Sequence, residues 1–258
     1  MHKKYFFFDI DGTLLSEVDK QMPESCKQTI MQLEKKGHFV AIATSRPYCL
    51  TKDTAKEMGI KNYVCDGGDG FVINHEPVEI LPLNLNDCLS LAKECIEANL
   101  PIATSIDTTN NRYSPDDTFI TCYPKLKGAF DFVTKEGFDV LESKAIHKMC
   151  IYCTKDDEVK LPSLAFVPHY RIDQDMILVE AIDKYKGILK MMDYLKGNKE
   201  DVVVFGDGTN DLDMFRQAPM SIAMGNAVSN LKEISTYITD NASDDGIYKA
   251  CKHFGWIE

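Results

Sequence analysis

Residues 6–13 read FFFDIDGT, and this stretch decides the fold. The run from residue 5 to residue 10 is apolar on both faces, which is typical of a strand buried in a parallel sheet. Ligands of such sheets bind at the carboxyl ends of the strands, which is where Asp9 and Asp11 stand. Gly12 permits the sharp turn that follows. The stretch therefore predicts an α/β fold with two carboxylates at one edge of its sheet.

A second stretch near the other end of the chain repeats this arrangement. Residues 202–205 read VVVF, again a buried strand, and they lead into GDGTND at 206–211. Asp207 and Asp211 then stand at a second strand end. Two strand ends that each deliver acids describe a site for a hard divalent cation, which prefers oxygen ligands. The sequence thus predicts a magnesium-dependent enzyme with Mg²⁺ as its cofactor.

Composition limits the partners of the chain. Its 258 residues are 44% hydrophobic and 27% charged, as in ordinary globular proteins. The net charge of −11 argues against nucleic acid, which is bound by basic patches. No stretch reaches the roughly 18–20 apolar residues that span a bilayer. Because a strand begins within the first residues, we also expect no secretory leader. We expect no membrane partner, and the oligomeric state is not readable.

The cysteines indicate a reducing compartment. There are nine, an odd number scattered without a framework, so we expect a cytoplasmic protein. Cys150 and Cys153 form a Cys-x-x-Cys pair with no second pair to complete a metal site. We interpret them as two cysteines of a strand.

Strands and helices alternate at both ends of the chain. In the first 80 residues we expect helices at 23–36 and 47–58 and strands at 39–43, 63–65 and 71–73. The alternation resumes with a helix at 186–195 and strands at 202–205, 221–224 and 237–239. Such alternation predicts right-handed crossovers and a doubly wound, Rossmann-like parallel sheet.

The middle of the chain differs in character. We expect helices at 87–98, 124–134 and 157–166, and strands at 101–106, 147–153 and 170–172. This pattern predicts an α+β segment with a core of its own. The chain therefore reads as a discontinuous core domain, 1–81 and 180–258, with a second domain inserted at 82–179.

The acids have separable roles. Asp9 and Asp207 are the leading metal ligands, and Asp211 binds the ion directly or holds its waters. If the metal clamps a phosphoryl group, Asp9 can attack phosphorus and form an acyl-phosphate. Asp11 can then protonate the leaving alkoxide and later serve as the base for water. Carboxylates at the Gly206–Asp207–Gly208 turn would repel a pyrophosphate, which argues against a dinucleotide site.

Two further segments supply polar groups. Thr44, Ser45 and Arg46 follow a buried strand and open a helix, where a hydroxyl either caps the helix or binds a phosphate oxygen. Arg46 either contacts substrate or lies on the surface. Lys186 precedes a helix at the point where the chain re-enters the core, and a phosphoryl site needs such a cation. Lys184 is a competitor two residues away.

In this order, the motifs resemble the haloacid dehalogenase (HAD) superfamily of phosphohydrolases. DIDGTL at 9–14 is similar to its first motif, Thr44 to the second, Lys186 to the third and GDGTND at 206–211 to the fourth. The resemblance implies Asp9 as nucleophile and Asp11 as acid/base. It also implies metal contacts from the Asp9 side chain, the Asp11 backbone carbonyl and Asp207. Phosphate contacts are implied at Ile10 (backbone), Thr44, Ser45, Lys186 and Asn210.

The C-terminal segments narrow the resemblance. IAMGNA at 222–227 and TDN at 239–241 with DDGI at 244–247 are similar to the Cof-type branch, subfamily IIB. That branch carries an α+β cap between the second and third motifs, which is where the composition changes. Two departures stand out, since Thr44-Ser45-Arg46 replaces the common Thr-Gly-Arg and DGGDG at 66–70 replaces an Asn-Gly element.

We expect hydrolysis of small phosphate monoesters, such as sugar phosphates or nucleotide-related metabolites. The cap would close over the substrate and set specificity. The alternatives are a sugar-phosphate phosphomutase and a non-catalytic phosphometabolite sensor, although a pure binder needs no nucleophile and acid together. Substrate identity lies in cap loops, among which TTNNRY at 108–113 is either a specificity loop or an ordinary solvated one.

Overall fold

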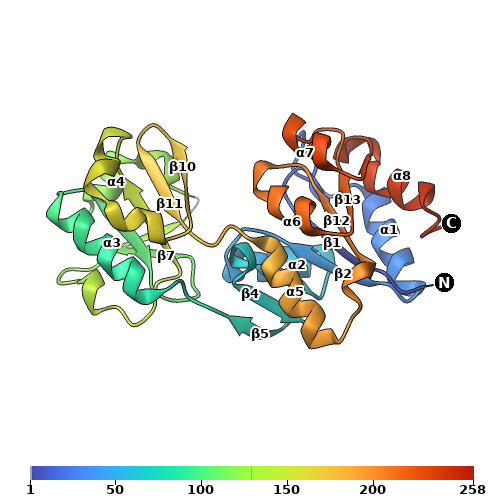
Figure 1. Cartoon of the computed structure of the whole chain (residues 1–258), viewed down its shortest axis with the longest axis horizontal. Coiled ribbons are helices and arrows are strands. Elements are labelled where there is room, and N and C mark those ends of the chain that lie inside the picture. The colour runs from blue at the N-terminus through green and yellow to red at the C-terminus, as the bar shows by residue number, and fades with distance from the viewer. Residues whose placement is uncertain (1, 129) are drawn as a thin grey trace. The chain divides into compact units, whose positions relative to one another are not determined.

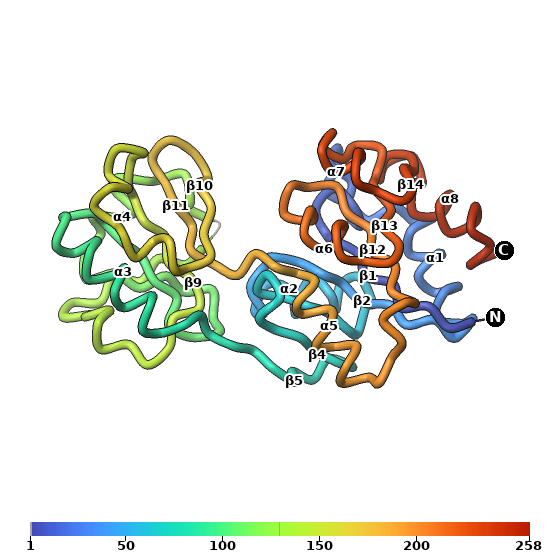
Figure 2. Tube along the Cα trace, in the orientation of Figure 1, coloured from blue at the N-terminus to red at the C-terminus, as the bar shows by residue number. Residues whose placement is uncertain are grey.

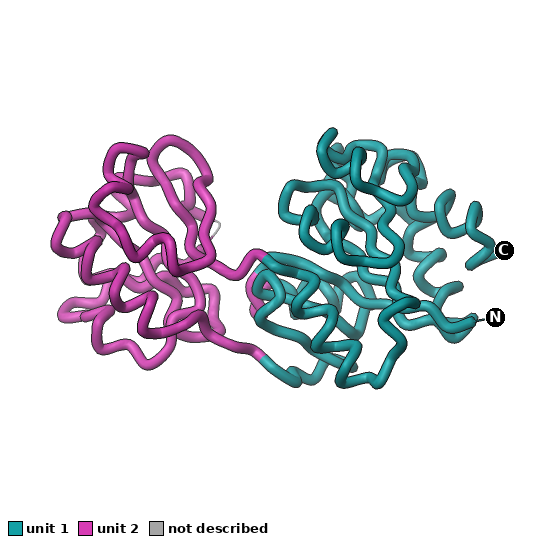
Figure 3. The backbone as a smooth tube through the Cα atoms, in the orientation of Figure 1, with its two compact units in different colours: residues 1–46, 51–79, 183–258 teal, residues 47–50, 80–182 magenta. Residues whose placement is uncertain are grey.

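The computed structural model describes residues 2–128 and 130–258. The chain divides into two compact units, unit 1 with residues 1–46, 51–79 and 183–258, and unit 2 with residues 47–50 and 80–182 (Figure 3). The trace leaves unit 1 along β5 (Glu76–Ile80) and returns before α5 (Lys184–Leu195), as Figure 2 shows. Unit 1 is therefore discontinuous in sequence. That residues 82–179 act as a cap stays a prediction.

Unit 1 is built on one sheet with β1 (Tyr5–Phe8) inside it. In the described part of the chain, this sheet has the order β14 (Tyr237–Ile238), β13 (Met220–Ala223), β12 (Val202–Gly206), β1, β2 (Phe39–Ala43), β3 (Tyr63–Cys65), β4 (Gly70–Ile73), β5. Neighbouring strands from β14 to β3 are parallel, and β4 runs antiparallel to β3. The expectation of a doubly wound α/β sheet is confirmed.

The apolar composition of β1 follows from its place in the sheet. It pairs with β12 on one side and β2 on the other, so Phe6, Phe7 and Phe8 have no exposed surface. Because β12 and β1 are parallel neighbours, their carboxyl ends meet at the same edge. The residues after these two strands are thereby brought together from opposite ends of the sequence.

Helices cover this sheet (Figure 1). They are α1 (Glu24–Lys35), α2 (Tyr48–Met58), α5, α6 (Leu212–Gln217), α7 (Ser229–Ile234) and α8 (Gly246–His253). On α1, residues Cys26, Ile30 and Leu33 are buried at helical spacing. Helix α5 lies close to the sheet, because a Cβ on Gly187 would stand 2.5 Å from Val64 Cγ1. That close approach fixes the start of α5 beside the strand ends.

Unit 2 is an α+β body with its own core. Its sheet has the order β10 (His169–Asp173), β11 (Met176–Val179), β9 (Lys148–Tyr152), β6 (Ile102–Ser105), β7 (Asn111–Ser114), β8 (Asp131–Thr134). Helix α3 (Leu85–Glu97) begins at Asn84, whose side chain accepts hydrogen bonds from two backbone amides. Cys88, Leu91 and Cys95 of α3 join a buried cluster with strands of this sheet.

Several element predictions in unit 2 are wrong. Residues 124–134 are not a helix: a 3₁₀ turn (Pro124–Leu126) is followed by Gly128 at φ +87° and then by β8, which pairs with β7. Residues 157–166 form two 3₁₀ turns (Asp156–Lys160 and Pro162–Phe166) instead of one helix. Pro162 lacks the N–H that a continuous helix requires. Strands β7 and β11 were not predicted.

No helix of the described residues is long and apolar enough to cross a membrane. All nine cysteines lie in the described residues, none of them is in a disulfide, and seven are buried. Cys150 lies in β9, as the interpretation of strand cysteines requires, and Cys153 is the first residue after the end of this strand.

Candidate active site

Three acids converge at the carboxyl edge of the unit 1 sheet. Asp9 follows β1, while Asp207 and Asp211 follow β12, and all three are buried. One carboxylate oxygen of each lies within 4.8 Å of the others. Buried acids this close repel one another unless a cation stands among them. The sheet topology therefore builds a cation-binding cluster from the two sequence stretches that predicted it.

The cation present in this cluster is Lys184. Its Nζ donates to Asp9 Oδ1 at 2.6 Å and to Asp211 Oδ1 at 2.7 Å, and its side chain has no exposed surface. Burial alone would lower the pKa of this ammonium, yet Asp211 and Asp9 together raise it above its usual value. Lys184 is therefore charged and neutralises part of the acid cluster.

Lys186, which the sequence analysis preferred, lies elsewhere. Its Nζ donates to Asp69 Oδ1 at 2.8 Å, and its side chain is 54% exposed. Of the two lysines, the structure places Lys184 and not Lys186 against the acid cluster. The reason is helical geometry: α5 begins at Lys184, and residues two apart on a helix point to different sides.

Asp211 uses both carboxylate oxygens within the protein. Oδ1 binds Lys184, and Oδ2 accepts hydrogen bonds from the backbone N–H groups of Asp207 and Gly208, both at 3.0 Å. A Cβ on Gly206 would stand 2.6 Å from this same Oδ2. Asp211 thus closes the turn after β12 and orients Asp207, and each of its carboxylate oxygens accepts at least one hydrogen bond within the protein.

Asp207 is held by residues that sequence reasoning did not assign. Thr13 Oγ1 donates to its Oδ1 at 3.0 Å, and Asn226 Nδ2 lies 3.4 Å from Oδ2 while donating to the Gly12 carbonyl at 2.8 Å. Thr13 stands in the DIDGT motif and Asn226 in the MGN segment. Both motifs were recognised in the sequence, but neither of these two residues was given a role. These contacts fix the Asp207 carboxylate against the turn after β1.

Asp11 differs from the buried acids. Its side chain is 56% exposed, and Arg46 binds it through two hydrogen bonds, Nη2 to Oδ1 at 2.7 Å and Nε to Oδ2 at 3.0 Å. Arg46 also donates through Nη1 to Thr54 Oγ1 at 3.1 Å. The Arg46 guanidinium is therefore held by side-chain partners within the protein, and it fixes the orientation of the Asp11 carboxylate.

The other predicted phosphate-binding residues follow the strands at this edge. Thr44 is buried after β2, and its Oγ1 accepts a hydrogen bond from the Arg46 backbone N–H at 3.1 Å. Asn210 Nδ2 donates to Ser45 Oγ at 3.3 Å, which joins the loops after β12 and β2. Ile10 is buried between Asp9 and Asp11. Hydroxyl, amide and ammonium groups thus lie around the acids.

Electrostatics distinguish the acids further. Burial raises the pKa of Asp9 to about 7, against the lowering effect of Lys184. Burial also raises the pKa of Asp207 to about 6, against the lowering effect of the Thr13 hydrogen bond. Both carboxylates are thus costly to ionise without additional positive charge. A divalent cation would supply that charge, and carboxylate oxygens are its preferred ligands.

Comparison with known proteins identifies the family. The sequence profile of the haloacid dehalogenase-like hydrolases matches residues 6–251. The chain belongs to this family. "Putative phosphatase YkrA" of Bacillus subtilis (strain 168) is 30% identical to this HAD-like chain, over 100% of both proteins.

Solved structures of the family have the same fold. That of the HAD subclass IIB sugar phosphatase BT4131 is 28% identical, with a TM-score of 0.76 over 99% of this chain and 100% of its own. A hypothetical protein from Geobacillus kaustophilus HTA426 is 25% identical, with a TM-score of 0.87 over 99% of this chain and 100% of its own. The predicted resemblance to the Cof-type, subclass IIB members is confirmed, and this HAD-like hydrolase is a phosphatase.

Proposed function

We propose that this phosphatase hydrolyses small phosphate monoesters through an aspartyl-phosphate formed on Asp9, with Mg²⁺ as cofactor. The observation that carries the proposal is the position of Asp9. It is buried at the end of β1, has one oxygen held by Lys184, and lies in a cluster with Asp207 and Asp211. A carboxylate fixed in this way can approach phosphorus with its second oxygen.

The donor set fits a magnesium ion. Asp9 and Asp207 would be its carboxylate ligands, and the backbone carbonyl of Asp11 would be a third protein ligand by family resemblance. Asp211 would act indirectly, because both of its oxygens are bound by Lys184 and the turn amides. When bound, Mg²⁺ neutralises charge on the phosphoryl oxygens and on the acids.

The first chemical step transfers the phosphoryl group to the protein. A carboxylate oxygen of Asp9 forms a bond to phosphorus while the ester P–O bond breaks and its electron pair leaves with the alkoxide. The Asp11 carboxyl group donates its proton to that alkoxide, for which the protonated oxygen must turn away from the Arg46 guanidinium that binds both oxygens in the structure. The exposure of Asp11, in contrast to buried Asp9, suits a group that meets a variable leaving group.

The second step releases inorganic phosphate. Asp11, now ionised, accepts a proton from a water molecule as the water oxygen attacks phosphorus, and the bond from phosphorus to Asp9 breaks. Thr44, Ser45, Asn210, Lys184 and the Ile10 backbone would bind the phosphoryl oxygens in both steps. Arg46 would act through Asp11. These hydrogen-bond donors are already oriented toward the site, so they would stabilise the negative charge that develops on the phosphoryl oxygens in the transition state.

The proposed substrate class is supported by relatives and by the second unit. BT4131 is a sugar phosphatase of the same subclass, which supports sugar phosphates as the first compounds to test. Nucleotide-related phosphates are the second group. Unit 2 has its own sheet and core, which supports its role as a cap that sets specificity.

The experiment is phosphate release from a panel of phosphorylated metabolites, with Mg²⁺ and with EDTA, by wild type and Asp9→Asn. We expect metal-dependent release that vanishes in the variant. Substantial phosphate release by Asp9→Asn would refute the assignment of Asp9 as the nucleophile. Isomerised sugar phosphate without free phosphate would instead identify a phosphomutase.

A further inference from the structure

Unit 2 contains an arginine with no exposed surface. Arg112 stands in β7, and its Nη1 donates to the carbonyl oxygens of Asn111 at 3.1 Å and Asn110 at 3.5 Å. The guanidinium carbon lies 4.2 Å from the centre of the Phe130 ring. Arg112 belongs to the polar segment 108–113, and the solvated-loop interpretation of that segment is wrong for this side chain.

One edge of the Arg112 guanidinium has no oxygen acceptor among the described residues. Neither Nε nor Nη2 finds an oxygen acceptor there, and the weakly accepting Cys150 thiol is the group that interacts with this guanidinium. The N–H groups on these two nitrogens point the same way from one edge of the planar group. Arg112 also forms no ion pair with any described carboxylate. Burial of a charged guanidinium without an anionic partner lowers the stability of the fold, so the presence of arginine at this position calls for an explanation.

Neighbouring groups do not balance the charge. Burial raises the pKa of the Cys150 thiol to about 11, against the lowering effects of the Arg112 charge and of a hydrogen bond with the Arg112 side chain. The thiol is therefore neutral at pH 7 and does not balance the charge. Glu180 is the acid that also acts on Cys150, and it is bound by Lys148 Nζ and by the Tyr170 hydroxyl at 2.9 Å. The buried cluster therefore carries one positive charge in excess.

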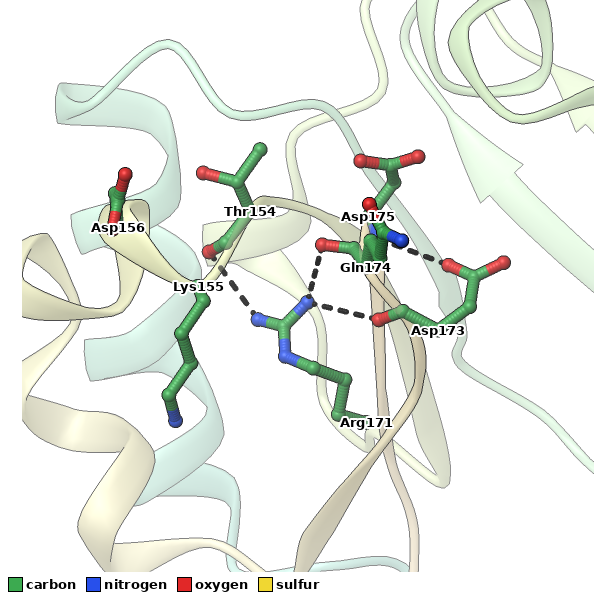
Figure 4. A pocket seen from close by; sticks show the side chains of 7 residues that line it. All are labelled: Thr154, Lys155, Asp156, Arg171, Asp173, Gln174 and Asp175. Carbon is green, nitrogen blue, oxygen red and sulfur yellow. Dashed lines mark hydrogen bonds between the residues drawn. The ribbon is translucent and has the colours of Figure 1, made fainter.

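Another arginine of unit 2 demonstrates that the fold can satisfy such a group. Arg171 lines an open hollow of about 630 Å³ with Thr154, Lys155, Asp156, Asp173, Gln174 and Asp175 (Figure 4). Its guanidinium donates to four backbone carbonyls and to the Glu158 carboxylate. Arg171 is thus saturated by structural partners, whereas the corresponding donors of Arg112 find no oxygen acceptor among the described residues.

We propose that the Nε–Nη2 edge of Arg112 binds a carboxylate or phosphoryl group through two parallel hydrogen bonds. This edge matches the two oxygens of either anion, and the anion supplies the missing negative charge. The group has two sources: a second anionic group of the phosphorylated substrate, which rests on the proposed function, or a free anion such as inorganic phosphate. Because Arg112 is fully covered, binding requires neighbouring side chains to move, the Phe130 ring among them.

The first test measures anion binding without turnover. The melting temperature of the full chain is recorded in EDTA with increasing inorganic phosphate or malonate, for wild type, Arg112→Met, Arg112→Lys and Lys125→Gln. Lys125 is an exposed residue of the same unit, so its variant removes one charge and leaves the buried edge intact. We expect a saturable rise for wild type and Lys125→Gln, at least halved in both Arg112 variants.

The second test measures recognition during catalysis. Phosphate monoesters with a second anionic group are compared with otherwise similar monoesters that lack one. If the substrate is the source, wild type prefers the former at least tenfold in kcat/KM. Both Arg112 variants lose this preference through a higher KM for the compounds that carry the second anionic group.

The outcomes are separable. If the Arg112 variants lose only the anion-dependent rise in melting temperature, the ligand of Arg112 is a free anion. If they lose the preference for substrates with a second anionic group, the ligand is that group of the substrate. The proposal is overturned if Arg112→Met changes neither the anion-dependent melting nor the preference. It is also overturned if both Arg112 variants melt far below wild type without anion, since the guanidinium is then structural. If wild type releases no phosphate from any compound, the proposed function fails while the melting test still decides the role of Arg112.

Discussion

Lys184 Nζ stands between two carboxylates, 2.6 Å from Asp9 Oδ1 and 2.7 Å from Asp211 Oδ1. This ammonium joins the ends of β1 and β12 and orients the side chain that we propose as nucleophile. Without it, two buried acids would face one another with no protein cation between them.

The first prediction compares the two lysines of α5. Lys184→Met is expected to lower kcat by a factor of roughly 10³ or more and to reduce stability by about 3–5 kcal/mol, because it leaves buried acids unpaired. Lys186→Met should stay within a factor of about three of wild type, since it loses one half-exposed ion pair with Asp69. Phosphate release and urea unfolding measure both quantities. Equal effects of the two variants would contradict the assignment of Lys184.

The second prediction concerns the proton donor. Asp11→Asn keeps a side chain for Arg46 to contact but cannot donate a carboxyl proton. We expect kcat to fall by roughly 10²–10⁴ for alkyl phosphates and much less for p-nitrophenyl phosphate, whose leaving group needs no proton. Steady-state rates on both compounds test this. A loss of the same size on each would remove Asp11 from the general-acid role.

The third prediction separates the acids by their partners. In Asp211→Asn, the amide oxygen can replace only one of two interactions, the one with Lys184 or the one with the turn amides. Magnesium affinity should therefore fall by about 10–100-fold through misplacement of Asp207. Asp207→Asn, which removes a proposed ligand, should cost more. Magnesium titrations followed by calorimetry compare the two, and a larger loss in Asp211→Asn would mean that Asp211 itself is a ligand.

The fourth prediction is a pH dependence without metal. Burial raises the pKa of Asp9 from its usual 3.8 to about 7, so between these values the folded protein binds more protons than the unfolded chain. The free energy of unfolding therefore falls as the pH rises from about 4 to about 7. In EDTA, wild type should melt at a lower temperature at pH 7.5 than at pH 5.5. Asp9→Asn should have a flatter profile, and an identical profile would disprove the burial effect.

The sequence predicted the acids more reliably than the cation. Asp9 and Asp207 could be predicted because two apolar strands end at them, and parallel neighbours bring such ends together. The lysine could not be chosen from sequence, because the start of α5 lies two residues earlier than its apolar pattern indicates. Periodicity marks the buried middle of a helix, whereas the first turn is set by its cap, here the Asp183 side chain.

Unit 2 was predicted less well for a related reason. Its strands are short, and residues 131–134 become a strand only through pairing with residues 111–114. Local sequence does not encode that partner. The Asp11–Arg46 pair likewise depends on the sheet placing the turns after β1 and β2 side by side. Contacts between distant segments therefore account for most of what the sequence left open.

The last prediction concerns the glycine of the first motif. A Cβ on Gly12 would lie 2.1 Å from Asp207 Oδ2, and the residue has φ +83°. Gly37 has a similar φ of +86° with nothing within 4 Å of its Cβ position, so it is a matched control. Both alanine variants carry the left-handed backbone cost of roughly 1–2 kcal/mol. Only Gly12→Ala also displaces Asp207.

We therefore expect Gly37→Ala to lose stability and retain its magnesium affinity. Gly12→Ala should lose stability to a greater extent and require at least tenfold more magnesium for half-maximal activity. Denaturant unfolding and magnesium titration of both variants provide the comparison. If the two variants require the same magnesium concentration, the close approach of Gly12 to Asp207 has no part in forming the metal site, and backbone conformation alone explains the glycine.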